Sequence, residues 1–380
     1  MKTNKWIVNT MCLIFMTGCK QQGSSSNPGS LEFGSIGSDT SNTHSNPKAS
    51  SNTVPKYVRF TKHEIMDPEG TGIVAFTCLL PEGWTVNDKL YWEYQDATLP
   101  IRYKADMQNA DGTMQIHSYP DVRAVQSSGP TGTSGYPPPT GILPGLKDFI
   151  RQQRKGIQYQ VLEEKMIRQI GPQTSYVQGS PMVSTSQNGF VKIGYTQNGT
   201  PMEEEFLGQL DISQMSSQGY ASLSSTVWAA SGLYSCSAPK GKLEDCQRMA
   251  LTIKSSSRPT LEFYNKFIQV TQLLSDAVYA RIYQAGQISR IISQTNDQIS
   301  KTISDSYWQS QKTYEGINNQ YSDALRGVDR YQDGRYEIQL PSGYSNAWVN
   351  DQGEYLLGEA SNFDPNTTLT GNWKQLNKQQ

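Results

Sequence analysis

The stretch from residue 258 to residue 328 constrains the fold of this chain more than any other. Apolar side chains recur there every three or four positions, as in Phe263, Phe267, Val270 and Leu274, and no proline interrupts the run after Pro259. This spacing predicts an amphipathic helix. One unbroken helix would approach about 100 Å at 1.5 Å per residue. We therefore expect a long helix or a helical hairpin, whose apolar stripe needs a covering surface.

Two surfaces could bury this apolar stripe. The helical segment can fold back near residues 285–287 and lean on the preceding domain, which the sequence favours. Alternatively it can pair with another chain, so that the long helix makes an oligomer. The polar face carries Gln, Ser, Asn and Thr rather than Glu and Lys, and this composition weakens the case for a coiled coil.

The region before the helical stretch, residues 56–257, contains short runs typical of strands. They include Tyr57–Phe60 and Gly72–Leu80, and Asn198-Gly199 is a strong signal for a hairpin turn. Helical spacing follows Leu243. The predicted fold class is α+β: an antiparallel-sheet domain with packed helices, then the long helical segment at 258–328, then a small β-rich C-terminal module at 329–380.

The N-terminal residues read as an export signal. Lys2 and Lys5 precede a short apolar run, and Thr17 and Gly18 are small residues before Cys19. The run is too short to cross a bilayer of about 30 Å. Its end resembles the lipobox of bacterial lipoproteins, and this resemblance implies cleavage after residue 18 and attachment of acyl chains such as palmitate to Cys19.

Residues 19–55 then form the lipidated cysteine and a linker rich in Ser, Asn and Gly. Such a segment buries too little apolar surface to fold, so we expect a disordered tether. The first partner is therefore a lipid bilayer, reached through the N-terminal anchor. Lys20 rather than Asp follows the cysteine, which predicts the outer membrane in a Gram-negative host; in a Gram-positive host the location is the outer face of the cell membrane.

Charge and cysteine content narrow the chemistry. The formal net charge is −1, without the basic surplus that nucleic-acid binding needs, so no nucleic-acid partner is expected. Cys236 and Cys246 are disulfide candidates in an oxidising compartment, and such a bond would stabilise the fold by roughly 3 kcal/mol; the alternative is that they are free buried thiols. Zinc-type cysteine spacing is absent, so no metal is expected. Neither a P-loop nor a dinucleotide-binding fingerprint is present, so no cofactor is expected.

Two further resemblances concern the folded part. The segments "VAFTCLLPEGWTVND" and "YSCSAPKGKLEDCQRMALTIKSS" resemble the PsbP/Mog1-like fold, whose members act mostly as binding or assembly modules. The C-terminal module resembles an element of uncharacterised bacterial secreted proteins and lipoproteins. The residues that carry this second resemblance are Arg326, Gly327, Val328, Tyr331, Leu340, Pro341, Gly343, Tyr344, Trp348, Asn350, Gly353, Glu354 and Tyr355. It implies no activity.

Four aromatic residues of the C-terminal module, Tyr344, Trp348, Tyr355 and Trp373, are candidates for a ligand surface. The alternative, which we favour, is that a small sheet needs these rings for its core.

Catalytic signals are sparse. Beyond the tether only His63 and His117 remain, the motif G-x-S-x-G is missing, and Glu203, Glu204 and Glu205 alternate faces on one expected strand. No catalytic residue is therefore proposed, and we expect no enzyme. The predicted function is a membrane-anchored cell-envelope lipoprotein, a non-enzymatic binding or assembly module with an envelope protein partner. The alternatives are an envelope glycan hydrolase using carboxylates and a structural helical adaptor of a surface or secretion complex.

Overall fold

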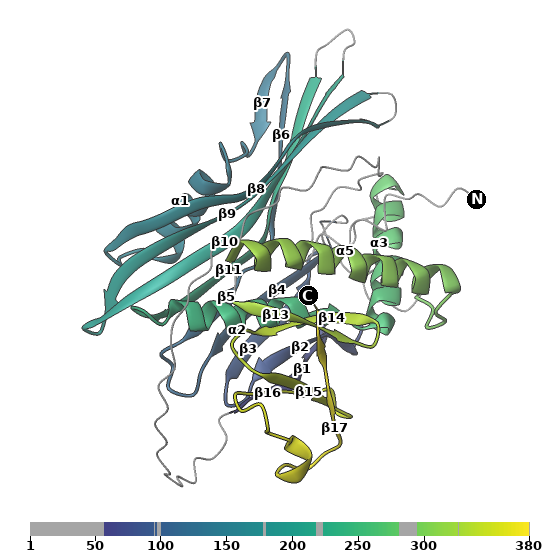
Figure 1. Ribbon diagram of the computed structural model, residues 1–380. Coiled ribbons are helices and arrows are strands. Elements are labelled where there is room, and N and C mark those ends of the chain that lie inside the picture. The colour runs from purple at the N-terminus through teal and green to yellow at the C-terminus, as the bar shows by residue number, and fades with distance from the viewer. Residues whose placement is uncertain are drawn as a thin grey trace, which may run out of the picture.

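The computed structural model describes residues 57–94, 96, 100–177, 180–217, 223–280, 295–325 and 327–379. The predicted signal peptide, Cys19 and the tether lie outside these residues, as does Arg326. Figure 1 shows a body of sheets and helices from which a long twisted ribbon of strands extends.

The ribbon belongs to an antiparallel sheet of nine strands. Its main order is β3-β4-β5-β11-β10-β9-β8, and β6 and β7 continue beside β11. The strands are β3 (Thr85–Trp92), β4 (Ile101–Gln108), β5 (Gln115–Ser118), β6 (Val122–Gly129), β7 (Gly132–Gly135), β8 (Tyr159–Val177), β9 (Ser180–Gln197), β10 (Thr200–Ser217) and β11 (Leu223–Pro239). The hairpin predicted at Asn198-Gly199 joins β9 to β10, and both residues have positive φ (50° and 81°), as a tight two-residue turn requires.

The second sheet has six strands and brings together the two ends of the described chain. Its order is β12-β2-β1-β16-β15-β17. The strands are β1 (Tyr57–Met66), β2 (Val74–Pro81), β12 (Arg258–Pro259), β15 (Asn346–Asn350), β16 (Tyr355–Gly358) and β17 (Trp373–Gln375). The first strand, β1, pairs with β16 from Tyr57 opposite Gly358 to Phe60 opposite Tyr355. A third, three-stranded sheet holds β13 (Val328–Asp333), β14 (Tyr336–Pro341) and β18 (Asn377–Lys378).

The longer helices pack on these sheets. α1 (Ile142–Gln153) buries Ile142, Leu146 and Ile150, which pack with residues of β9, β10 and β11. α2 (Leu243–Ser256) lies in the body and contacts β2, β11 and β14. α3 (Leu261–Ala280) and α5 (Lys301–Leu325) follow it.

The predicted fold class is wrong. Antiparallel sheet dominates, helices are the minority, and no continuous helix spans 258–328 within the described residues. The described part of α3 extends to Ala280, residues 295–300 are not helical, and α5 starts at Lys301. Polar contacts hold the chain before α5 against α3: the Asn296 backbone N–H donates to the Gln269 side chain at 2.6 Å, and the Asn265 amide donates to the Asn296 carbonyl at 2.8 Å.

The apolar stripe of α3 is covered by the chain itself. Phe263, Phe267 and Val270 are fully buried in the main core, together with Tyr307 and Tyr314 of α5. These residues are therefore not available to a second chain. The C-terminal strands divide between two sheets: β13, β14 and β18 form the three-stranded sheet, whereas β15, β16 and β17 complete the sheet that β1 and β2 begin.

Within the described residues, no helix is both long enough and apolar enough to cross a membrane.

Candidate functional site

An apolar cavity of about 70 Å³ lies between α2 and the strands β4, β5 and β11. One water needs roughly 10–15 Å³ measured in this way, so the cavity can hold several waters or a small organic molecule. Most of the wall is apolar, and a few polar groups interrupt it. The wall consists of Ile65, Cys78, Ile101, Tyr103, Met107, Ile116, Ser118, Tyr119, Asp121, Gly232, Leu233, Tyr234, Ala250, Ile253, Lys254 and Ser257.

A kink in β11 positions the first charged group. β11 pairs with β6 through Ala230 and with β5 from Tyr234 onward, so the strand changes partner at residues 231–233. Gly232 at this point has a φ of 58°, a conformation that glycine adopts without strain. Its backbone N–H leaves the ladder and donates to Asp121 Oδ1 at 3.0 Å. The kink therefore fixes Asp121, which lies in the connection between β5 and β6, at the cavity wall.

The second oxygen of Asp121, Oδ2, is one of several buried side-chain polar atoms for which no hydrogen-bond partner is found among the described residues. Burial raises the pKa of this carboxyl from 3.8 to about 8, although the Gly232 N–H and the positive charge of Arg102 oppose the shift. A buried polar atom without a hydrogen-bond partner costs roughly 1–3 kcal/mol, and a ligand that forms a hydrogen bond with Oδ2 would recover this free energy.

Lys254 supplies the opposite charge from the last turn of α2. The hydroxyl of Tyr314 on α5 donates to the backbone carbonyl of Lys254. The Nζ atom of Lys254 lies 5.0 Å from the centroid of the Tyr234 ring. Burial lowers the pKa of its ammonium group to about 7, while Asp121 acts in the opposite direction. The cavity wall thus contains a carboxyl group, Asp121, and an amino group, Lys254, that both titrate near neutral pH.

The disulfide candidates come together, but as free thiols. Cys236 of β11 and Cys246 of α2 are both fully buried. A hydrogen bond with Cys246, together with burial, raises the pKa of the Cys236 thiol well above its ordinary value. Cys246 also donates to the Gln115 carbonyl at 3.6 Å. Glu205 lies opposite Cys236 in the ladder, and burial raises the pKa of its carboxyl to about 7.

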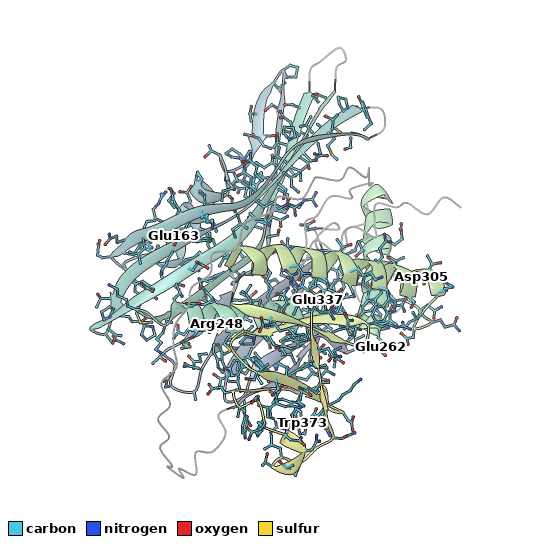
Figure 2. All side chains as sticks on the ribbon, viewed as in Figure 1. Glu163, Arg248, Glu262, Asp305, Glu337 and Trp373 are labelled. Carbon is cyan, nitrogen blue, oxygen red and sulfur yellow. The ribbon has the colours of Figure 1, made fainter. Side chains whose placement is uncertain are left out.

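The C-terminal aromatic residues lie in the core or against it, which agrees with the interpretation favoured from the sequence over a ligand surface. Trp348 and Trp373 share a buried cluster with Leu356 and Phe363, and Tyr355 belongs to a neighbouring cluster. The exposed fractions of Trp348, Tyr355 and Trp373 are 5%, 8% and 4%. Tyr344 is half-buried against the Tyr355 cluster. Figure 2 shows Trp373 at the β17 end of the six-stranded sheet. Short strands with few residues need bulky rings to fill their core, which explains this placement.

Sequence reasoning did not find Asp121 or Lys254. Asp121 stands in a short connection, and Lys254 follows the apolar residues of α2 as a solvent-exposed lysine ordinarily would. Neither residue belongs to a local sequence motif. The β5–β6 connection and α2 line the same cavity only because β11 pairs with both β5 and β6. Among the described residues, no group of three or more His, Cys, Asp or Glu side chains is placed to hold a metal ion.

Comparisons with known proteins give little. No protein-family model matches the chain, and no curated protein matches it. Among solved structures, the chain is similar to LpqN, described as involved in cell envelope biogenesis of Mycobacterium tuberculosis, at 10% identity and a TM-score of 0.18. That similarity covers 53% of this chain and 91% of LpqN. At this TM-score it supports no statement about fold or function.

Proposed function

We propose that this protein is a membrane-anchored lipoprotein of the cell envelope that acts by binding, not by catalysis. Its ligand is a small molecule with an apolar body and a polar head, held in the cavity between α2 and β11. The sequence at residues 1–55 supports the anchor and the location, through the export signal, Cys19 and the tether.

One observation carries the binding function: the Asp121 Oδ2 atom is buried at the wall of an apolar cavity without a hydrogen-bond partner among the described residues. Buried polar atoms in native proteins nearly always have partners, and an exception calls for a ligand, a water or an ion. An apolar cavity with a few convergent polar groups is also the usual form of a small-molecule site.

The charges at the wall define the head of the ligand. Burial keeps Asp121 mostly protonated at neutral pH, so a bound ammonium group must draw it into its ionised, accepting form, and a bound carboxylate must likewise hold Lys254 in its ammonium form. Because most of the rest of the wall is apolar, the remainder of the ligand is hydrophobic. A zwitterion with a small apolar side chain meets all three conditions.

Three probes test this arrangement: L-valine, which has both charged groups, isobutylamine, which has the cation alone, and isovalerate, which has the anion alone. The assay is the thermal unfolding midpoint of the full-length chain in detergent at neutral pH, because a ligand that binds only the native state raises it. We expect L-valine to raise the midpoint most. Asp121→Asn should abolish the effect of isobutylamine and keep that of isovalerate, and Lys254→Met should do the reverse.

Matched controls make the same chemical changes at exposed positions, Asp351→Asn and Lys312→Met. Both should respond to the probes as the unmodified protein does. The proposal fails if no probe raises the midpoint, or if the cavity variants and the controls respond alike.

A further inference from the structure

The distal half of the ribbon carries no formal charge. Three stretches of sequence lack Asp, Glu, Lys and Arg altogether: residues 124–146, 169–191 and 212–239. Ladder pairing brings parts of all three together. We define the arm tip as residues 124–135, 171–177, 180–186, 212–217 and 223–229. In Figure 1 this is the end of the β6–β11 ribbon that extends away from the body.

The arm tip is rich in Ser and Thr, and a few large apolar side chains are exposed among them. The exposed fractions of Val125, Tyr176 and Leu223 are 44%, 74% and 54%. Depletion of charged residues is one compositional feature of the core of a protein–protein interface. A surface built for solubility instead carries about 25–35% charged residues.

The outer edge of β8 shows where contact can form. β8 is the last strand of its sheet, and no other strand among the described residues pairs with its outer side. In the half of β8 nearer the body, the ladder with β9 contains register shifts between Val161 and Glu163, between Met166 and Arg168, and between Ile170 and Gln173. Such bulges, and charged side chains such as Glu163 (Figure 2), are the devices that prevent strands from pairing edge to edge.

The tip half of β8 has neither device. From Gln173 to Val177 the ladder with β9 is regular, with Thr174 opposite Val183 and Ser175 opposite Met182. Residues 171–176 are all exposed, and none is charged. From Gln173 to Val177 this edge therefore offers backbone donors and acceptors to an added strand, whereas Pro172 just before it has no N–H to donate.

A second copy of this chain fits that edge best. Two copies of an uncharged edge meet without like-charge repulsion, and an antiparallel pair of identical strands closes on a two-fold axis. A lipid interior does not fit, because hydrocarbon leaves the free backbone groups of an open edge unsatisfied. We propose that two copies of the protein pair through residues 173–177 of β8, which join the two nine-stranded sheets into one continuous sheet.

The test is the oligomeric state of the full-length chain in detergent, measured by light scattering coupled to size exclusion. The unmodified protein should be a dimer. Ser175→Lys places two like charges near the axis and should raise the dimer dissociation constant at least about tenfold. The matched control is Ser225→Lys. Ser225 lies in the same row across the sheet, through Met215 and Met182, but on the inner strand β11, so this variant should stay dimeric.

A cysteine scan over residues 173–176 locates the axis. Identical residues at the axis of an antiparallel pair lie about 4.5–5.5 Å apart between Cβ atoms, so one position should form an intermolecular disulfide far more readily than its neighbours. Unchanged thermal midpoints of the variants show that the fold is kept. A monomer at every concentration, an assembly larger than a dimer, equal effects of the two lysine variants, or a scan without a maximum would each overturn the proposal.

Discussion

Asp121→Asn should change how the stability of the protein depends on pH. The pKa of Asp121 rises from 3.8 to about 8 on folding because the carboxylate loses its hydration. The native state therefore holds a proton that the unfolded chain releases above pH 3.8. A group of this kind stabilises the fold fully below its unfolded pKa, and the contribution is lost as the pH rises toward the folded pKa. Asn has no proton to lose, so the variant lacks this decline.

The magnitude follows from the size of the shift. Each pH unit between the two pKa values costs at most ~1.4 kcal/mol, and a shift of about four units gives an upper limit of about 6 kcal/mol. Water that enters the cavity solvates the ionised carboxylate and reduces this cost. We therefore expect the variant to gain about 2–4 kcal/mol relative to the unmodified protein between pH 4 and pH 8.

Urea unfolding followed by tryptophan fluorescence across this pH range measures the difference. Glu205, whose pKa is also raised by burial, contributes equally to both proteins and cancels. Lys254 has the opposite sign, because its folded pKa of about 7 lies below its ordinary 10.5. Its contribution to stability is complete above that ordinary value and is lost as the pH falls toward 7. Lys254→Met should therefore remove the loss of stability that accompanies a fall in pH from about 10.5 to 7. Parallel curves for Asp121→Asn and the unmodified protein would refute the reasoning.

Three further outcomes are expected. Cys19→Ser should abolish incorporation of a radiolabelled palmitate and leave the N-terminal segment uncleaved, as gel mobility and fractionation of membranes will show; a labelled variant would contradict the anchor. Gly232→Ala places a side chain at a φ of 58° and should lower the free energy of unfolding by about 1–2 kcal/mol, whereas Gly316→Ala on α5 should not lower it. Trp348→Ala empties a buried site and should cost about 3–5 kcal/mol in urea unfolding, whereas an exposed ligand-binding ring would cost almost nothing.

Local signals predicted local structure well. Asn198-Gly199 indicated the β9–β10 turn because two residues with positive φ are needed there, and the spacing after Leu243 indicated α2. The pattern after Pro259 misled because a helical period cannot say where a helix stops. Contacts of Asn265 and Gln269 with the backbone near Asn296 separate α3 from α5, and they arise only when the chain folds.

The cavity could not be predicted for a related reason. Asp121 and Lys254 are far apart in sequence, and each is an ordinary polar residue in its own segment. Their proximity depends on β11 changing partner at Gly232, a feature of tertiary pairing that leaves no periodic trace. The roles of Trp348 and Trp373 were similarly open until their burial was known, because a surface platform and a small core use the same residue types.

The pairing of β1 with β16 has a consequence for biogenesis. A ribosome delivers β1 first and β16 almost last, so the earliest strand must wait through nearly the whole of synthesis with one side bare. During that time it is a target for chaperones and for unwanted strand pairing. A chain that stops before Tyr355 cannot form the β1–β16 ladder, so the six-stranded sheet is complete only when the last part of the chain is present.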